Sequence, residues 1–399
     1  MTIISNENIK NFILSIVLFL FSLENHGNIR LAFAAIIIIL SLLLLKTQKI
    51  PVKPTLLLLK TSSLLLFISL LSLFSIFTYK ENMGEYNSVE FFYSTQVKIF
   101  LIILFFYIIK DDKNSLCTIL KYSILFHVSI FFIQLAMIYT TGIYPDFLFP
   151  FTGEASRYTW GVKIPIIGST YRPTGMFNEP STYFSILLPF VILRYYLSNK
   201  LSRVDCWALL SFYLTLSFAA IIISSIFIII INLTGKKIHK LIPFVILLLI
   251  VLTPLLINFY ELRTSGNYDA IGIRQNLNNA LLEQPLSDLL FGNGPVGVPL
   301  SLEYLYLSNA LSWTKNGFAA INDNGLMIFI IMKFGVIGML FLILIIYKNI
   351  RIATYTLVCL LPFATKIKLT SLTFIFFIFV IILFSKERKN ENRFPNKLP

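Results

Sequence analysis

The stretch YRPTGMFNEPSTYFSILLPF (171–190) carries the strongest local signal for chemistry in this chain. Arg172 stands eight residues before Pro180, and a proline and a glycine between them favour a fixed turn. A guanidinium group binds phosphate oxygens bidentately and remains charged throughout. Pro180 suits the first turn of a helix, which Asn178 or Glu179 would cap. Glu179 is therefore either a candidate general base or only a helix cap.

A second polar stretch holds a similar set of groups. Arg274 lies near the start of an amphipathic segment, GIRQN, and Asp323 and Asn324 directly precede an apolar run. Asp323 is the second candidate base. Lys333 lies about ten residues inside that run, roughly 15 Å deep in a helix that rises 1.5 Å per residue. An ionised group at that depth must face protein, water or a ligand, so Lys333 either binds lipid phosphate or pairs with a buried acid or carbonyl.

Two other patterns do not support a cofactor. GNGPVG (292–297) matches the spacing of a dinucleotide-binding loop, but no strand–turn–helix unit frames it and Pro295 interrupts it. We expect a tight turn there, with a backbone phosphate nest as the alternative. The carboxylates of the long loops are scattered rather than clustered, so we predict no metal site and no cofactor.

The composition places these groups in a membrane protein. Of the 399 residues, 57% are hydrophobic and 13% are charged, whereas a soluble domain carries about 25% charged residues. The net charge of +14 is not a nucleic-acid signal, because most of the 33 Lys and Arg fall in short tracts between apolar runs. That distribution is the positive-inside pattern.

The apolar runs divide the chain into helices. Residues 204–232 would make one helix of roughly 43 Å, long for a membrane core of about 30 Å. Two short helices that meet near Ser217 return the basic tract GKKIHK (235–240) to the cytoplasm. The other predicted spans are 9–23, 29–45, 61–79, 92–109, 116–140, 180–197, 241–257, 323–347, 352–365 and 370–385.

We therefore predict an all-α polytopic membrane protein with about 12 transmembrane helices, both termini cytoplasmic, and two long periplasmic loops. Its segments are the N-terminal helices (1–141), the first long loop (142–179), the middle helices (180–257), the second long loop (258–322), and the last helices with a basic tail (323–399). Loops of this length are usually functional or disordered, and their Trp, Tyr, Gly and Pro content favours order.

The stretch Arg172-Pro-Thr-Gly175-Met-Phe177-Asn-Glu179-Pro180 resembles the O-antigen polymerase and O-antigen ligase families of bacterial surface polysaccharide assembly. These families share an Arg-x-x-Gly-x-Phe-x-(Glu/His)-Pro type signature at the outer start of a middle helix. The second long loop agrees with the same pattern. Where the ligases usually have His-Asn before the late helix, this chain has Asp323-Asn324, and its three histidines lie outside both long loops. The resemblance therefore favours the polymerases.

The resemblance implies a glycosyltransferase that polymerises repeat units carried on polyprenyl pyrophosphate, at the periplasmic face of the inner membrane. It also implies a separate chain-length regulator as partner. The placement of the basic residues between apolar runs predicts no nucleic-acid partner. A ligase that transfers polymer to lipid A-core, and a transporter or flippase for lipid-linked oligosaccharide, are the alternatives. A transporter concentrates its polar residues near the midplane, often in broken helices, whereas here they lie in the long loops.

The chemistry of such a transfer assigns roles to these residues. No nucleotide sugar is available outside the cell, so the donor's pyrophosphate must leave, and guanidinium groups would match its charge. We expect Arg172 and Arg274 to clamp one pyrophosphate. Either Glu179 or Asp323 takes the acceptor's proton, and Glu179 is favoured over Asp323 because it shares a segment with Arg172. The residues expected to contact substrate are Asn178, Gly175, Asn324, Lys333 and Trp160. Inversion or retention at the sugar, and O-antigen or capsule as product, stay open.

Overall fold

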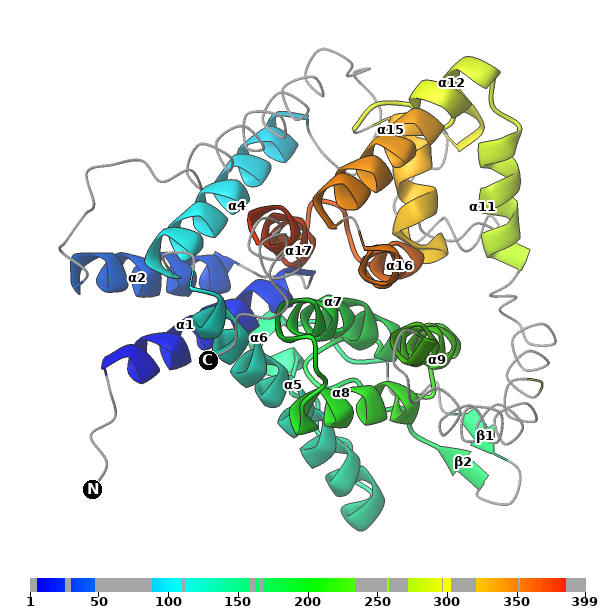
Figure 1. Cartoon of the computed structure of the whole chain (residues 1–399). Helices are drawn as coiled ribbons and strands as arrows, with labels where there is room; N and C mark the ends of the chain where they lie inside the picture. Colours follow the sequence, from blue (N-terminus) through cyan, green and yellow to red (C-terminus); the bar gives the residue numbers. More distant parts are fainter. Residues whose placement is uncertain are drawn as a thin grey trace.

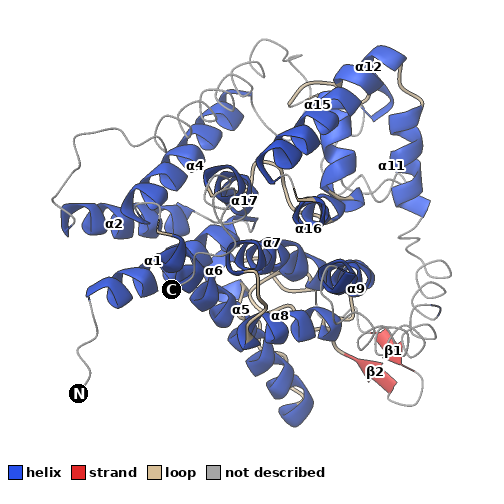
Figure 2. Ribbon diagram, in the orientation of Figure 1, coloured by secondary structure: helices blue, strands red, loops and turns tan. Residues whose placement is uncertain are grey.

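The computed structural model describes residues 6–25, 30–46, 88–109, 112–157, 162–164, 168–233, 257, 272–295, 297–302, 321–350 and 352–384. These residues are almost entirely helical (Figure 2). The exception to the all-α prediction is one small antiparallel hairpin, β1 (Val162–Ile164) and β2 (Gly168–Thr170), in which Lys163 pairs with Ser169. The hairpin lies within the first long loop.

The helices follow the apolar runs of the sequence. They are α1 (Asn6–Ser22), α2 (Arg30–Lys46), α4 (Ser88–Ile109), α5 (Lys113–Thr141), α6 (Phe149–Thr152), α7 (Pro180–Ser198), α8 (Arg203–Leu214), α9 (Phe218–Leu233), α11 (Gly272–Leu282), α12 (Leu286–Phe291), α15 (Leu326–Ile350), α16 (Ala353–Leu360) and α17 (Leu372–Leu383), with single 3₁₀ turns η1 (Leu23–Asn25), η2 (Leu300–Leu302), η3 (Ile321–Asn324) and η4 (Leu361–Ala364).

Two helices, α7 and α17, lie at the centre of the molecule (Figure 1). Both are largely apolar and nearly all of their residues are buried, as expected for a helix that is surrounded by others. α5 packs against α1, α7 and α8, whereas α17 packs against α4, α7 and α15. The central pair thus joins the N-terminal helices to the C-terminal ones.

Several helices are long and apolar enough to cross a membrane. Among the described residues they are Phe91–Ile109, Lys113–Thr141 and Leu326–Ile350, and shorter apolar helices cover Phe218–Asn232, Ala353–Ala364 and Leu372–Leu383. The chain is thus a helical protein with several apolar helices of the kind found in membranes. The predicted span 61–79 lies outside the described residues, and so does 241–257 apart from residue 257.

The predicted break within 204–232 is confirmed. α8 ends at Leu214 and α9 begins at Phe218, and Leu216 between them takes a positive φ of 51°. A non-glycine residue in the left-handed region ends a helix sharply, because its backbone cannot continue the α-helical path. Two short helices replace one overlong helix.

The predicted span over 323–347 corresponds to α15, which is long and apolar enough to cross a membrane, but it is not one continuous helix. Residues Ile321–Asn324 form the 3₁₀ turn η3, and α15 is broken at Gly335, whose φ of 68° and ψ of −179° are not helical. The sequence signal was an unbroken apolar run, which says nothing about backbone angles. The break exists because loop backbone from residues 290–294 packs against it.

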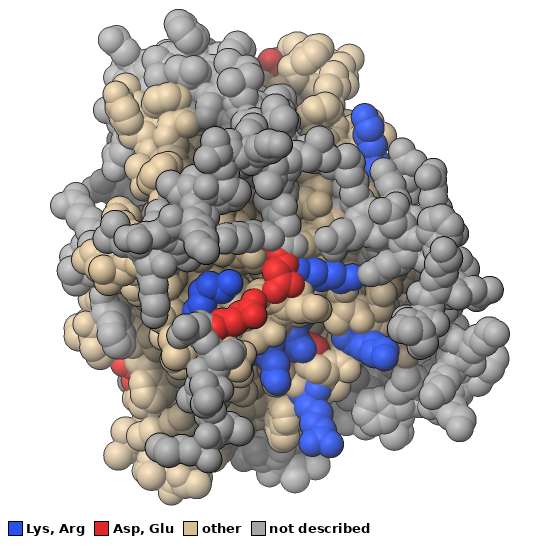
Figure 3. Space-filling view, turned by 60° about the vertical axis from the view of Figure 1, so that its left-hand side comes forward, with Lys and Arg blue, Asp and Glu red and all other residues tan. Residues whose placement is uncertain are grey.

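Helix ends that were predicted to face the cytoplasm contact one another. The Asn11 amide donates to the Ser115 hydroxyl over 3.2 Å, which joins the starts of α1 and α5. Asp112 caps α5 through the backbone N–H of Asn114 and Ser115. These contacts lower the pKa of Asp112, the hydrogen bond with the Ser115 side chain most strongly. On one face of the molecule basic side chains surround a few acidic ones (Figure 3).

Helix ends that were predicted to lie on the opposite side also meet. Glu24 of η1, the turn that follows α1, forms an ion pair with Lys98 of α4, and it accepts the backbone N–H of Leu372 at the start of α17. The first residue of α15, Leu326, donates its backbone N–H to the carbonyl of Thr365 over 2.8 Å. Loops far apart in the sequence are therefore gathered at this end of the helices.

Candidate functional site

Lys366 joins the two carboxylates that the sequence singled out. Its Nζ lies 2.6 Å from Asp323 Oδ1 and 3.6 Å from Glu179 Oε2. Glu179 precedes α7 and Asp323 belongs to η3, whereas Lys366 lies in the loop between η4 and α17. The three side chains are 19%, 24% and 23% exposed, respectively, so an ion in solvent can reach them. We call Glu179, Asp323, Lys366 and the two arginines described next the charged cluster.

Arg157 is the second cation on Glu179. Its guanidinium forms an ion pair with Glu179 Oε1, and its backbone N–H donates to the carbonyl of Asn178 over 2.8 Å. The Asn178 amide in turn donates to Glu154 Oε1 over 2.6 Å. The end of the first long loop is thereby fastened to the start of α7, and Asn178 helps to hold this loop.

Glu179 occupies the N-cap position of α7, and Pro180 occupies the first turn, as predicted. However, its carboxylate makes no capping hydrogen bond to the helix backbone. Instead it accepts the Ser181 hydroxyl over 3.1 Å and pairs with Arg157 and Lys366. The side chain is therefore oriented toward the charged cluster, and a capping role does not account for it.

Arg274 reaches the charged cluster from α11. Its Nε donates to the backbone carbonyl of Asp323 over 3.3 Å. Asn324 fastens the same two elements, because its amide donates to the carbonyl of Arg274 over 2.7 Å and to Asn278 Oδ1 over 2.6 Å. α11 has the predicted amphipathic pattern, with Leu277 among its buried residues. The structure therefore brings Arg274, Asp323 and Asn324 together.

Arg172 has a different environment. Its side chain is 7% exposed, and its Nε donates to the carbonyl of Thr215 over 3.3 Å, at the break between α8 and α9. The last carbonyls of a helix carry partial negative charge, which a cation stabilises. This hydrogen bond holds Arg172 at the helix break, whereas Arg274 is held at η3.

The turn that carries Arg172 is fixed by buried neighbours. Gln134 of α5 accepts the backbone N–H groups of Thr174 and Gly175, each over 2.8 Å. Gly175 has a φ of 61°, and a Cβ there would lie 3.2 Å from the ring of Tyr183. Tyr144 hydrogen-bonds the Thr174 hydroxyl over 2.9 Å, and burial raises the pKa of Tyr144 to about 12. Gly175 thus shapes the turn rather than the surface of the charged cluster.

Lys333 is buried at the break in α15. It donates to the carbonyl of Gly297 over 2.6 Å and lies 5.6 Å from the centre of the Phe329 ring. Of the two alternatives raised by the sequence, these contacts match pairing with a carbonyl. The structure describes no contact of Lys333 with the charged cluster.

The GNGPVG loop fills the same break. The backbone N–H groups of Asn293 and Gly294 donate to the carbonyls of Met332 and Lys333 over 3.0 and 2.9 Å. Those carbonyls have lost their helical partners, and a buried carbonyl needs a donor. Gly292 has a φ of 81°, and a Cβ there would lie 2.4 Å from the Lys333 backbone. The loop is a tight turn, and these two N–H groups are already used.

Sequence reasoning missed Arg157 and Lys366. Lys366 lies between the last two apolar runs, in a loop predicted to be periplasmic, where the positive-inside pattern leaves few basic residues. That exception was the available signal. Arg157 offered none, because one arginine in a long loop is ordinarily solvated. Trp160, predicted to contact substrate, lies outside the described residues.

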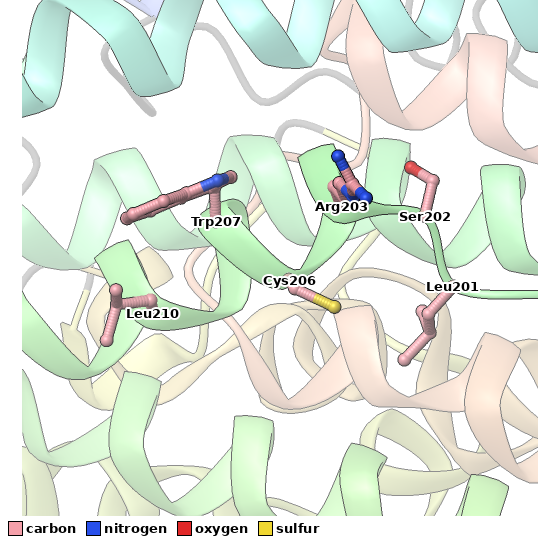
Figure 4. Close-up of a pocket in the computed structure, with 6 residues that line it drawn as sticks. All are labelled: Leu201, Ser202, Arg203, Cys206, Trp207 and Leu210. Atoms are coloured by element: carbon pink, nitrogen blue, oxygen red, sulfur yellow. The ribbon is translucent and has the colours of Figure 1, made fainter.

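A shallow hollow of about 370 Å³ lies elsewhere, at the beginning of α8. Figure 4 shows its lining, with Arg203 and Trp207 on the first turns of the helix and Leu201 in the loop before it. Arg172 binds the opposite end of α8, at Thr215. The hollow is therefore separate from the predicted site residues.

Comparison with protein-family models, with curated proteins and with solved structures finds no match to this chain.

Proposed function

We propose that this chain is a glycosyltransferase that polymerises oligosaccharide repeat units. It moves the growing glycan from polyprenyl pyrophosphate to the next lipid-linked unit at the periplasmic face of a bacterial inner membrane. The observation that carries the proposal is the ion-paired set of Glu179, Lys366 and Asp323, with Arg274 hydrogen-bonded to Asp323. These residues come from four separate segments, three of which the family resemblance had singled out.

The charged cluster can stabilise a diphosphate as it leaves the sugar. Arg157 and Lys366 pair with two carboxylates, and Arg274 adds a third cation at the backbone of Asp323, so the positive charges outnumber the negative ones and the cluster attracts an anion. Developing charge on the leaving oxygen is stabilised most strongly by charges that are already in place. The acceptor hydroxyl gives its proton to Glu179 or Asp323, its oxygen bonds to the anomeric carbon, and the bond to the diphosphate breaks.

The position of the charged cluster at the helix ends fits a lipid-linked donor. A polyprenyl chain lies in the bilayer, so its diphosphate is held at the membrane surface. The proposed topology has about 12 spans and cytoplasmic termini. In this topology the start of α7, the turn η3 and the end of η4 all lie on the periplasmic side. Diphosphate and charged cluster then meet at the same depth.

In this proposal Arg172 has a structural role and is not chiefly a ligand of the phosphate groups. Because it is 7% exposed and donates to Thr215, it positions the turn before α7. Arg274, Lys366 and Arg157 are the more accessible cations. The clamp on the diphosphate is thus assigned chiefly to these three groups.

A transporter of lipid-linked oligosaccharide is the second candidate, because α15 is broken around the buried Lys333. Broken helices with polar residues at depth are typical of transporters. However, the loop at Asn293 and Gly294 already occupies the carbonyls that the break exposes. In a transporter those carbonyls would face the substrate path, so the polymerase remains the preferred function.

Deletion of the gene separates the candidate functions. Without a polymerase, the lipid A-core carries a single repeat unit, which gel electrophoresis of the extracted glycolipid detects. Without a ligase, the core is bare and full-length polymer stays on the carrier lipid. Loss of a transporter leaves repeat units on the cytoplasmic leaflet. Either of the last two results contradicts the polymerase.

Point variants in the deletion strain test the charged cluster. Arg274→Ala, Glu179→Gln and Asp323→Asn should each abolish or shorten long chains at matched expression. Gln275→Ala is the matched control, because Gln275 is exposed on the same helix as Arg274. Normal chain length in Arg274→Ala, with protein present in the membrane, would contradict the site.

A further inference from the structure

The ion pair between Lys366 and Asp323 occupies one carboxylate oxygen of Asp323, a candidate general base. Lys366 Nζ lies 2.6 Å from Asp323 Oδ1, a close charge-assisted contact. An oxygen that already accepts from an ammonium group is poorly placed to accept the proton of an incoming hydroxyl. In this arrangement, without donor, Oδ1 of Asp323 is therefore occupied by Lys366.

The two carboxylates differ in what else holds them. Glu179 has a second cation, Arg157, on Oε1, and it also accepts the Ser181 hydroxyl. Among the described residues, Lys366 is the cation that pairs with the Asp323 carboxylate. If Lys366 moves away, Glu179 keeps a partner, whereas Asp323 is released.

A diphosphate would compete for Lys366. Its clustered negative charges attract a cation more strongly than one carboxylate does. Lysine has a compact ammonium on a flexible four-carbon stem, so it can change partners without a backbone movement. The backbone N–H of Lys366 is meanwhile held by the Ser185 hydroxyl of α7 over 3.2 Å. Only the side chain needs to move.

We infer that Lys366 moves from Asp323 to the diphosphate of the donor, and that this exchange frees Asp323 to act as the general base. The inference rests on the proposed function and deepens it, because it chooses between the two carboxylates. Glu179 stays with Arg157 and positions the first turn of α7. Deprotonation of the acceptor is thereby coupled to loading of the donor.

In the resulting step each bond formed is matched by a bond broken. The acceptor hydroxyl gives its proton to the freed Asp323 carboxylate while its oxygen bonds to the anomeric carbon. The bond from that carbon to the diphosphate oxygen breaks, and its electron pair leaves with the oxygen. Lys366 and Arg274 face the charge that develops there. Asp323 passes its proton to water when the lipid diphosphate departs, and Lys366 returns.

The test measures binding of inorganic pyrophosphate to the purified full-length protein in detergent micelles, by titration calorimetry. Lys366→Gln should weaken binding about tenfold, the loss of one charge-assisted contact. Asp323→Asn should tighten binding by about two- to fivefold, because the carboxylate that competes for a partly exposed lysine is gone. The same Asp323→Asn variant should make no long chains.

Lys368→Gln is the matched control, since it removes the same charge from the same loop, and it should leave pyrophosphate binding within about twofold. Gel filtration checks that each variant is folded. If Lys366→Gln is not folded, Lys366→Arg replaces it as a variant that keeps the charge. Weaker or unchanged pyrophosphate binding in Asp323→Asn overturns the exchange, even if long chains are lost. If deletion of the gene leaves polymerisation normal but Asp323→Asn binds pyrophosphate more tightly, the proposed function fails while the anion exchange stands.

Discussion

At the scale of single residues, Arg172 stabilises a helix end. Its Nε donates to the carbonyl of Thr215, where α8 stops and Leu216 turns the chain. A buried carbonyl that loses its donor leaves an unsatisfied group, and hydrogen bonds to charged groups contribute about 1.5–3 kcal/mol. Arg172→Ala should therefore lower the thermal unfolding temperature in micelles as well as remove long chains.

Arg203→Ala is the control for this substitution. Arg203 is exposed at the opposite end of α8, so its loss should leave both the unfolding temperature and chain length close to normal. Arg172→Ala with normal stability but no long chains would show that Arg172 acts directly on the donor. The positioning role would then be wrong.

Tyr144 makes the stability of the folded protein depend on pH, and the direction of that dependence follows from the burial of its side chain. Burial disfavours the phenolate, so the pKa of Tyr144 rises from 10.0 to about 12, although the hydrogen bond with Thr174 partly opposes the shift. A pKa raised by folding means that the stabilisation is complete below pH 10 and is lost as pH rises toward about 12. Wild type should therefore lose stability across that interval.

Tyr144→Phe isolates this contribution, because phenylalanine cannot ionise. The free energy of unfolding of the variant, followed by circular dichroism from pH 9 to about 12, should fall less steeply than that of wild type. The variant should also be less stable at neutral pH, since Thr174 loses its partner. Parallel curves for the two proteins would mean that Tyr144 ionises freely in the folded state.

At the scale of elements, the break in α15 is held open from outside the helix. A Cβ on Gly335 would lie 2.0 Å from the carbonyl oxygen of Leu290, and the φ of 68° is strained for any other residue. Gly335→Ala must therefore close the helix or displace the 290–294 loop, and we expect a loss of about 2–4 kcal/mol from strain and clash together.

Gly153→Ala is the comparison for this loss. Gly153 has nearly the same φ, 69°, but its ψ of 4° lies in the left-handed region, and nothing lies within 4 Å of its added Cβ. It should lose only about 1–2 kcal/mol from backbone strain. Unfolding by denaturant in micelles measures both variants, and equal losses would show that the contact with Leu290 does not hold the break open.

The two helix breaks show how much of the fold the sequence could reveal. The break near Ser217 was predictable, because the length of 204–232 and the basic tract after it favour two helices over one. The break at Gly335 was not, since its cause is Leu290, a residue in another element. The same reason applies to the charged cluster: Arg274, Glu179 and Asp323 matched a motif, whereas Lys366 is placed by the loop after η4.

At the scale of the whole molecule, the contacts sort the helix ends into two groups. One group joins the starts of α1 and α5, as in the pair Asn11 and Ser115. The other joins η1, α4 and α17 through Glu24, and the charged cluster belongs to the loops of this second end. A chain that works on a membrane-bound donor needs this separation, because the reacting groups must all face one compartment.

Thiol labelling in intact cells tests which compartment that is. With the three native cysteines replaced, Ala364→Cys places an exposed probe beside the loop of Lys366, and Lys200→Cys places one in the loop between α7 and α8. A reagent that crosses the outer but not the inner membrane should label position 364 and spare position 200, which reacts only after the cells are broken. The reverse pattern would put the charged cluster in the cytoplasm, where no polyprenyl-linked chain grows under this proposal, and the polymerase would have to be abandoned.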